Sequence, residues 1–404
     1  MALDSPYYLA VGSLVIEDGS DAGPYHPIGI WFPAPEPDGI GGYLPAVRRF
    51  DVRVTGTSAA SLAANTAALH QACVRDETLY FRASGSGNTR SCRIREASVV
   101  EEEVDLLAAL QFERTVTVTL TTDPYWLDQW GSWVTVSGLV PGTAFSIPAA
   151  GGDVPALLDM RVVCNATAGA TGIFIGTKPA PGTGYSPNHQ QISTTGTLSG
   201  TSVEVLTAPD PMDARDNSGN HLVLIRLSFS TTGDASITNR VVTIGYQVSP
   251  MVTVDQKYPS TFAATTAQQT VETGEVTLPS CALPSGATGD GYSVDHNILI
   301  AKDSGGTATL YRVTRVPLDH GAVLARGTFA ASAGILYDAD TGMVFIADAD
   351  GAGAPVAGAV VKQPLRAAPD ATTSVVVALT GSPSQDTFGA VQYRLRRRSL
   401  TATG

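Results

Sequence analysis

The chain is poor in charged residues, in aromatic residues and in cysteine. Of its 404 residues, 15% are charged and 7% are aromatic, and four are cysteines. The charged fraction is well below the roughly 25% that is usual for soluble domains, which suits a protein that buries much of its surface in an assembly. The cysteines show no C-x-x-C spacing, so zinc-ribbon and redox motifs are excluded and free, buried thiols are expected. They are Cys73, Cys92, Cys164 and Cys281.

The chain also lacks a basic stripe, a long apolar run and a visible signal peptide. Its net charge is −12, whereas a nucleic-acid binder needs clustered Lys and Arg to displace counterions. No apolar run approaches the roughly 18 residues of a membrane helix, and no basic region with an apolar core opens the chain. The dense basic run consists of Arg394, Arg396, Arg397 and Arg398. We interpret it as a solvated strand edge, with an intersubunit salt-bridge site as the alternative.

Sequence motifs for catalysis and cofactor binding are missing. There is no G-x-S-x-G elbow, no phosphate-binding loop and no H-E-x-x-H pair. Acidic residues are too common for the sequence to select the two carboxylates of a glycosidase. None of the six histidines has a partner at metal-ligand spacing. We therefore expect no catalytic residue, no cofactor and no metal, and we expect that the chain is not an enzyme. The histidines are His26, His70, His189, His221, His296 and His320.

Abundant glycine, proline and β-branched residues predict a mainly β fold. The chain has 41 Gly and 25 Pro, and Thr, Ser and Val crowd the segments between them, which is typical of strands joined by turns. The clearest strand spans residues 111–122, where apolar residues alternate with Thr on the two faces of a half-buried strand. Its apolar face comprises Phe112, Val116, Val118 and Leu120. The strand ends at Asp123-Pro124, because proline cannot continue the pairing.

A single helix is expected, over about Ser58–Val74. Alanine is abundant there, and Leu62, Leu69 and Cys73 recur at helical spacing to form one apolar stripe. Ser58 or the residue before it can cap the helix. Further strands are predicted at Thr78–Ala83 and Arg90–Val100, with a turn at 85–88 between them and an acidic interruption at 101–103.

Downstream of Trp133 the pattern predicts strands and no helix. The expected strands are Met160–Cys164, Gly172–Gly176, Ser202–Thr207, His221–Phe229, Val241–Val248, Val294–Ile300, Ala308–Val316, Gly334–Tyr337, Met343–Ala347, Ser374–Thr380 and Ala390–Arg396.

Four segments follow from this pattern. Residues 1–130 are expected to form an α+β domain that holds the helix, a long β-hairpin and, over residues 1–47, one apolar stretch followed by a loop. Residues 131–255 are expected to form a jelly-roll or galectin-like β-sandwich. A connector rich in Thr, Ala, Pro and Gly covers 256–290. Residues 291–404 are either a second sandwich or the completion of the preceding one, and strand spacing does not decide between them.

The order of elements over roughly residues 47–127, ending in Asp123-Pro-Tyr-Trp126, resembles the N-terminal domain of distal tail proteins of long-tailed bacteriophages. Downstream, Gly152-Asp-Val-Pro-Ala-Leu-Leu158 is similar to the start of the galectin-like domains in that family. The resemblance implies a structural virion protein whose N-terminal domains form a ring, expected to be a hexamer, at the tail tip. It also implies that this ring joins the tail tube protein to the baseplate hub, after assembly in the host cytoplasm.

Three residue sets are candidate sites. The charged set could pair between neighbouring subunits of a ring, because opposite charges lie on one hairpin of a charge-poor chain; it comprises Arg90, Arg93, Arg95, Glu101, Glu102 and Glu103. The aromatic set is either a sugar-stacking platform or a buried domain junction; it comprises Tyr125, Trp126, Trp130 and Trp133. The acidic set is either two ordinary turns or a Ca²⁺ site; it comprises Asp338, Asp340, Asp348 and Asp350.

Two other functions remain open at this point. One is a carbohydrate-binding module that adsorbs to a glycan on the host surface, alone or as part of a tail. The other is a tail-associated hydrolase, which would need a cleft with coupled acidic groups. No feature of the sequence indicates such a cleft.

Overall fold

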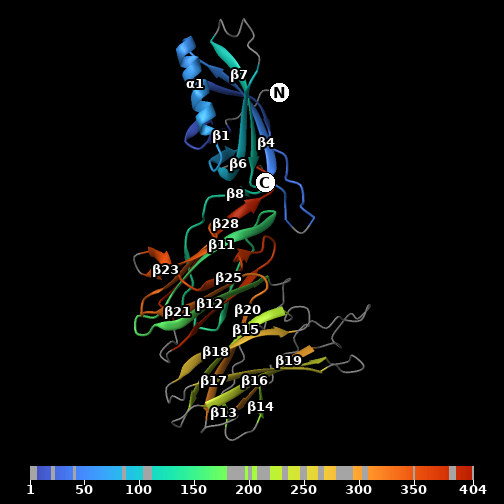
Figure 1. Cartoon of the computed structure of the whole chain (residues 1–404), viewed down its shortest axis with the longest axis vertical. Coiled ribbons are helices and arrows are strands. Elements are labelled where there is room, and N and C mark those ends of the chain that lie inside the picture. Colours follow the sequence, from blue (N-terminus) through green and yellow to red (C-terminus); the bar gives the residue numbers. More distant parts are fainter. Residues whose placement is uncertain are drawn as a thin grey trace. The chain divides into compact units, whose positions relative to one another are not determined.

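The protein is mainly β, with one helix in its described part (Figure 1). The structure is a computed structural model that describes residues 7–19, 23–39, 42–83, 88–102, 112–179, 196–198, 203–206, 219–229, 235–245, 253–262, 268–278, 294–302, 308–348, 351–381 and 388–402. The chain divides into two compact units. Unit 1 contains residues 1–131, 151–156 and 396–404, and unit 2 contains residues 132–150 and 157–395.

Unit 1 combines a helix with two antiparallel sheets that share one long strand. Its elements are β1 (Tyr8–Val11), β2 (Leu14–Glu17), β3 (Tyr25–Trp31), β4 (Ala46–Thr55), α1 (Ala59–Ala72), β5 (Thr78–Arg82), β6 (Arg90–Glu101), β7 (Glu113–Thr122) and β8 (Trp126–Leu127). One sheet has the order β2–β1–β5–β6–β8. The other, which we call the open sheet, has the order β3–β4–β7–β6. Strand β6 pairs with β5 as far as Arg93 and with β7 from Ile94 onward, so the long hairpin expected from the sequence is confirmed.

The core of unit 1 forms where the inner face of the open sheet meets the helix and the first sheet. Alternate residues of β4 and β7 are fully buried, and Leu62 and Leu69 of α1 join the same cluster. The strand residues are Phe50, Val52, Val54, Val116, Val118 and Leu120. The two-residue period of the sequence therefore predicted the buried face of β7 correctly, with one exception. Phe112 precedes the strand with a positive φ of 54° and is 36% exposed, so it does not join that face.

The helix confirms the predicted stripe and cap. Ser58 closes a capping box: the Ser61 N–H donates to the Ser58 Oγ at 3.2 Å, and the Ser58 N–H donates to the Ser61 Oγ at 2.9 Å. Leu62 and Leu69 are buried, and the buried hydroxyl of Thr66 donates to the Leu62 carbonyl at 2.9 Å. The one polar residue of the buried stripe is therefore satisfied within the helix.

We expect Ser58→Ala to weaken the helix by about 1 kcal/mol, because the Ser61 backbone N–H in the first turn would lose its acceptor, the Ser58 Oγ. Hydrogen exchange of the first-turn amides in the full chain measures this loss. Ser58→Asp is the matched control, since a carboxylate oxygen also accepts at this position. Equal loss of protection in both variants would contradict a capping role.

Unit 2 holds most of the strands. Its elements are β9 (Val134–Thr135), β10 (Ala144–Ile147), β11 (Val154–Val163), β12 (Ala170–Pro179), β13 (Gly196–Leu198), β14 (Val203–Leu206), β15 (Gly219–Phe229), β16 (Ala235–Gly245), β17 (Thr253–Phe262), β18 (Gln269–Leu278), β19 (Val294–Lys302), β20 (Ala308–Pro317), β21 (Ala322–Phe329), β22 (Gly334–Asp338), β23 (Met343–Asp348), β24 (Gly351–Pro355), β25 (Ala359–Gln363), β26 (Arg366–Ala367), β27 (Thr373–Thr380) and β28 (Ala390–Ser399). The first residues of β11 and the last residues of β28 belong to unit 1.

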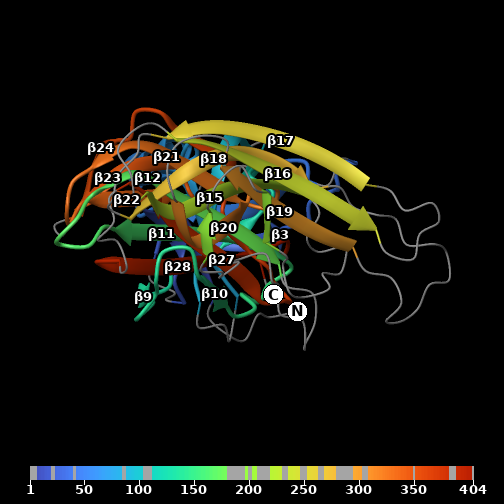
Figure 2. The same cartoon turned by 90° about the horizontal axis from the view of Figure 1, so that it is seen from below.

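The strands of unit 2 form antiparallel sheets. Two of these sheets are built by a segment inserted between β12 and β21, two strands of the middle sheet. The middle sheet has the order β10–β27–β12–β21–β25. Between β12 and β21 the chain builds two further sheets, β13–β20–β15–β18 and β14–β19–β16–β17. Strands β16, β17 and β19 run side by side in the second of them (Figure 2). Sheets that begin before residue 255 are thus completed by strands after residue 291.

The middle sheet is covered on both faces. All eight residues of β27 are buried, and such a strand reads as a continuous apolar run rather than an alternation. One face of the middle sheet packs against the β15–β20 pair, with Phe174, Leu324 and Val376 on one side and Leu222 and Leu224 on the other. The apolar layer between these sheets anchors the inserted sheets to the rest of unit 2.

Two expectations about strand content need correction. Strands β17 and β18 occupy much of the segment 256–290 that was expected to be a connector. Strand β3 and the start of β4 lie in the segment that was expected to be a loop. In both segments proline and glycine interrupt the pattern; β3 contains Pro27 and Gly29 with a register shift between them. Edge strands tolerate such interruptions, so composition alone misassigned them.

Candidate functional site

The outer face of the open sheet is the most distinctive surface of unit 1. Opposite the buried face, β7 presents a row of half-buried threonines, and exposed side chains of β4 and β6 flank that row. The threonines are Thr115, Thr117, Thr119 and Thr121, and the flanking residues include Val47, Arg49, Arg53, Ser98 and Val100. The strand pairing places Thr119 between Arg49 on β4 and Ser98 on β6. This face is polar but low in net charge.

Both edges of the open sheet are unpaired in the part of the chain that the structure describes. Strand β3 pairs with β4 alone, and Ile28 and Trp31 on it are 63% and 57% exposed. At the opposite edge, β6 pairs with β7 over Ile94–Glu101, and no described strand lies on its other side beyond Arg93. Unpaired N–H and C=O groups of this kind are available to a further strand.

A shallow hollow of about 450 Å³ lies beside the β3 edge. Gly29, Ile30 and Trp31 of β3 line it together with Arg49 and Asp51 of β4. The Arg49 side chain pairs with Asp51 at 3.1 Å, and the Thr117 hydroxyl donates to the same carboxylate at 2.7 Å. The hollow is therefore lined by the exposed indole of Trp31 and by the ion pair of Arg49 with Asp51.

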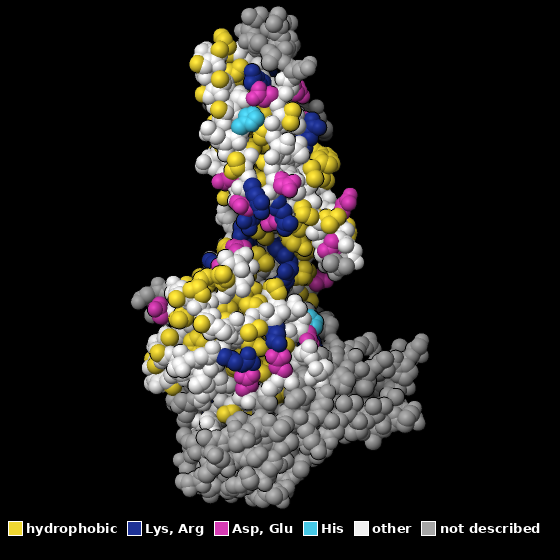
Figure 3. All heavy atoms as spheres, in the orientation of Figure 1, with side chains coloured by type: hydrophobic (Ala, Val, Ile, Leu, Met, Phe, Trp, Pro, Cys, Tyr) yellow, Lys and Arg dark blue, Asp and Glu magenta, His cyan; other side chains and the backbone are white. Residues whose placement is uncertain are grey.

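The three arginines predicted to contact a neighbouring subunit all have acidic partners within the chain. Arg90 is buried; its Nε lies 2.9 Å from Asp128 Oδ1, and its guanidinium also donates to the Thr401 carbonyl at 2.9 Å. On the surface, Arg93 pairs with Asp76 at 2.8 Å and Arg95 with Asp123 at 2.6 Å. Basic and acidic side chains accordingly lie next to one another on unit 1 (Figure 3).

The three glutamates of the same prediction lie at the end of β6 or beyond it. Glu101 pairs with Arg114 and lies 3.3 Å from His70. The Glu102 N–H donates to the Thr115 carbonyl at 3.1 Å, so the acidic residues extend the ladder rather than interrupt it at once. Glu103 lies outside the described residues. Pairing of the charged set between subunits stays a prediction.

The aromatic set does not act as one platform. Trp126 is fully buried in the core of unit 1, with its ring centroid 5.5 Å from that of Phe32 and 6.1 Å from that of Phe81. It therefore presents no face to a sugar. Three arginines of β28 each lie over another aromatic of the set, which corrects the interpretation of that basic run as a solvated edge. The pairs are Arg398 over Tyr125 at 4.4 Å, Arg396 over Trp130 at 5.8 Å and Arg394 over Trp133 at 4.7 Å.

A buried arginine contacts the segment that ends in Trp126. Arg48 is fully buried, and its guanidinium carbon lies 4.2 Å from the centre of the Trp126 ring. Its Nε donates to Thr122 Oγ1 at 2.8 Å and its Nη2 to the Pro124 carbonyl at 3.4 Å. Burial lowers the pKa of Arg48. The sequence carried a signal for this residue, because Arg48 is in phase with the buried positions of β4.

The acidic set lies in and beside an ordinary hairpin turn. Asp338 ends β22, and its Oδ1 accepts the N–H groups of Asp340 at 2.9 Å and Thr341 at 3.4 Å before β23 begins. Asp348 ends β23, and Asp350 lies outside the described residues. Among the residues that the structure describes, no three His, Cys, Asp or Glu side chains form a group that could hold a metal ion.

The described cysteines are poor nucleophiles. Cys73, Cys92 and Cys164 are free and buried, as the sequence predicted. Burial raises the pKa of Cys73 to about 12 and the pKa values of Cys92 and Cys164 to about 11. These thiols therefore stay protonated near neutral pH, and the thiolate is the reactive form. Cys281 lies outside the described residues. No described helix is long and apolar enough to cross a membrane.

Comparison with known proteins leaves the family open. No protein-family model matches the chain, and no curated protein matches it. Chains from two structures of the phage P2 baseplate in its activated conformation, one with Ca and one with Sr, align over 97% of this chain and 97% of their own. Their identities are 8% and 7%, and their TM-scores are 0.25 and 0.22. An exo-β-1,3-galactanase from Phanerochaete chrysosporium aligns over 66% of this chain and 54% of its own, with 10% identity and a TM-score of 0.11. Such TM-scores are too low for these likenesses to carry an argument.

Proposed function

We propose that the chain is a structural component of a phage tail tip, of the distal tail type, in which copies of unit 1 assemble into a ring. The observation that carries the proposal is the open sheet, with its solvent-facing polar side and its two unpaired edges among the described residues. Because the edges belong to different strands, a contact between β3 of one copy and β6 of the next is head-to-tail. Repetition of such a contact closes a ring when the rotation between copies permits it.

Exposed apolar side chains lie where this contact would form. Ile28 and Trp31 project from β3, and Val100, which is 56% exposed, projects from the β6 edge. A strand added at an edge gains main-chain hydrogen bonds, and nearby apolar side chains then lose contact with water. In a ring of this kind the threonine row of every copy would face the same side of the continuous sheet.

The resemblance to distal tail proteins supports the identity of the partners. The residues that carry it, from 47 to 127, are those that build β4, α1, β5, β6 and β7 and end at the buried Trp126. The proposal therefore includes a ring of six copies in the virion, in contact with the tail tube protein and the baseplate hub. It includes no catalytic step and no cofactor.

The test is the symmetry of the purified full-length protein, read from negative-stain class averages and native mass spectrometry. We expect ring-shaped particles of six copies. Ile28→Lys should leave only monomers at the same concentration, because a charged side chain on an edge strand opposes further pairing. The side chain is already largely exposed, so the fold of the monomer should survive.

Val74→Lys is the matched control. Val74 is 45% exposed in the same unit, follows the helix and lies on neither edge of the open sheet. Rings should persist in this variant. A wild-type protein that stays monomeric as concentration rises, or rings that tolerate Ile28→Lys, would count against the proposal.

A further inference from the structure

The hollow beside β3, which we call the β3 hollow, forms around a glycine on the outer face of the open sheet. The strand pairing places Gly29 beside Asp51 and Trp31 beside Arg49, and these four residues line the hollow together with Ile30. A Cβ atom at Gly29 would lie 3.7 Å from the Asp51 Oδ2, which is an ordinary contact distance. Because glycine has no side chain, it leaves room for a ligand atom next to this carboxylate oxygen.

The ion pair in the β3 hollow keeps a donor and an acceptor available. Asp51 Oδ1 accepts the Arg49 Nε at 3.2 Å, the Arg49 Nη2 at 3.1 Å and the Thr117 hydroxyl at 2.7 Å. Within the described part of the chain, Asp51 Oδ2 accepts one longer bond of 3.4 Å from the Arg49 Nη2, and the Arg49 Nη1 makes no hydrogen bond. The two side chains therefore hold each other in place while Oδ2 and Nη1 remain free to bind a ligand.

Trp31 supplies an apolar wall next to these polar groups. Its side chain is more than half exposed, so the indole has a face that a ligand can cover. The charges of Arg49 and Asp51 balance, and a charged ligand would meet a like charge in the hollow. An uncharged ligand with one apolar face and a polar rim fits this arrangement best. The volume of about 450 Å³ lies within the roughly 300–1,000 Å³ of small-molecule sites.

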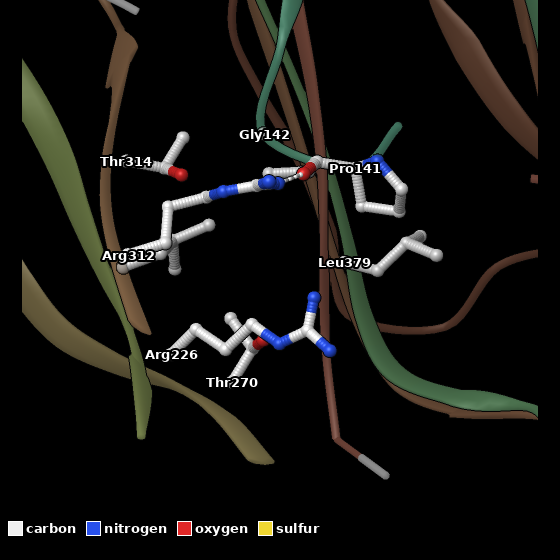
Figure 4. A pocket seen from close by; sticks show the side chains of 9 residues that line it. Pro141, Gly142, Arg226, Thr270, Arg312, Thr314 and Leu379 are labelled. Carbon is white, nitrogen blue, oxygen red and sulfur yellow. Dashed lines mark hydrogen bonds between the residues drawn. The ribbon is translucent and has the colours of Figure 1, made fainter. Parts of the chain in front are cut away.

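Two other spaces do not suit such a ligand. A hollow of the same volume on unit 1 is lined, among the described residues, by Arg, Asp and Glu alone and so lacks an apolar wall. In unit 2, Arg226 and Arg312 extend into a cavity between two sheets (Figure 4). Its free volume is about 20 Å³, close to the roughly 10–15 Å³ needed for one water molecule.

We propose that the β3 hollow binds an uncharged hexopyranose ring at the end of a glycan. The C–H groups on one face of the sugar pack against Trp31 and lose contact with water. One hydroxyl donates to the Asp51 Oδ2, and a neighbouring hydroxyl accepts from the Arg49 Nη1, since a hydroxyl can do either. For a ligand of this size in an open hollow we expect a Kd of roughly 1–10 mM.

Saturation-transfer-difference NMR of the full chain tests the proposal. The probes are the methyl pyranosides of glucose, galactose, mannose and N-acetylglucosamine. We expect at least one of them to bind with a Kd in the millimolar range, with the largest signals from C–H protons on one face of the sugar. Glycerol is the control ligand and should give no signal, because it has neighbouring hydroxyls but no ring to cover the indole. Absence of binding by all four pyranosides would overturn the proposal.

Gly29→Val is the most direct variant, because it fills the β3 hollow without removing a binding group. The position is exposed on an edge strand, where a β-branched residue is well tolerated, and circular dichroism checks that the fold persists. Binding should fall at least tenfold. Gly29→Ala adds only the Cβ at an ordinary contact distance and should weaken binding less.

Trp31→Ala should also weaken binding roughly tenfold, because the sugar loses its apolar wall. Trp133→Ala is the matched control: it removes a tryptophan of unit 2 that is 37% exposed, and it should leave the Kd unchanged. Unchanged binding in Gly29→Val, or a loss in Trp133→Ala equal to that in Trp31→Ala, would refute binding at this site.

Sugar binding does not rest on ring assembly. The same Kd is expected in Ile28→Lys, because residue 28 does not line the β3 hollow. A protein that binds a pyranoside but forms no rings would therefore contradict only the ring. Rings without sugar binding would contradict only the site.

Discussion

Deletion of residues 396–404 is expected to lower the free energy of unfolding of unit 1 by roughly 3–6 kcal/mol. The deletion removes the hydrogen bonds of two charged side chains, Arg396 and Arg398, and each such loss costs about 1.5–3 kcal/mol. The reason is that the end of β28 is part of unit 1 rather than an appendage. The Arg396 Nε donates to the Asp128 carbonyl at 2.8 Å, and the Arg398 Nε donates to the Pro155 carbonyl at 2.6 Å. Ser399 pairs with Trp126 across the ladder.

The deletion should also remove hydrogen-bond partners of side chains in the remaining part of unit 1. Arg90 is buried and donates to the Thr401 carbonyl, so the deletion would remove one of its acceptors. Loss of a hydrogen bond to a charged group costs about 1.5–3 kcal/mol. The measurement is hydrogen exchange in the full chain and the deletion variant, compared at the amides of β6 and β8 and at those of β15 and β20. Protection should fall in the first group and persist in the second.

Two point variants distinguish this role from a general effect of shortening the chain. Arg398 is 4% exposed and stacks over Tyr125, whereas its neighbour Arg397 is exposed. Arg398→Met should reproduce a large part of the loss in unit 1, and Arg397→Met should change little. Equal effects of the two substitutions, or unchanged exchange after the deletion, would show that unit 1 does not need this segment.

Trp126→Ala is expected to destabilise unit 1 by about 3–5 kcal/mol, the usual cost of removing a buried aromatic side chain. The indole is fully buried and packs against two phenylalanine rings, which also contact each other. The cost should lie at the upper end, because Arg48 would lose the ring that covers its guanidinium while its own charge stays buried. Denaturant unfolding followed by far-ultraviolet circular dichroism, together with exchange of the β4 and β7 amides, assigns the loss to unit 1.

The matched control is Trp31→Ala in the same unit. Trp31 is 57% exposed on the β3 edge, so its removal should change monomer stability by about 0.5 kcal/mol or less. Arg48→Met combined with Trp126→Ala gives the coupling between the two residues. A double variant as unstable as the sum of the single variants would show that the stacking contributes nothing of its own.

Local patterns predicted most elements because the physics behind them is local. The alternation in β7 places Val116, Val118 and Leu120 on one face whatever the rest of the chain does, since successive side chains of a strand point in opposite directions. The helix likewise begins at Ser58, where a side-chain oxygen can accept from the first turn. The downstream strands that were predicted end within three residues of the observed ends, as in β27. However, β11 and β16 begin six residues before the predicted starts, and β21 and β25 were not predicted.

Prediction failed where proline and glycine interrupt a strand that its neighbours still hold. In β3 the bulge at Pro27 and Gly29 breaks the alternation, yet β4 supplies the pairing partner. In β18 a register shift falls near Gly274, and β15 keeps the strand in place. Composition measures what a segment does alone, whereas these strands exist because another strand pairs with them.

The sequence by itself determined the mainly β class, the single helix of the described residues, the alternating faces and the absence of catalytic motifs. Tertiary structure alone decided that two sheets are inserted between β12 and β21, that Arg48 is buried under Trp126, and that residues 396–404 complete unit 1. Each of these joins segments far apart in the chain; the bond from Arg90 to Thr401 spans 311 residues. Such contacts depend on which faces pack together in the folded chain. The periodicity of one segment does not indicate which distant segment it will contact.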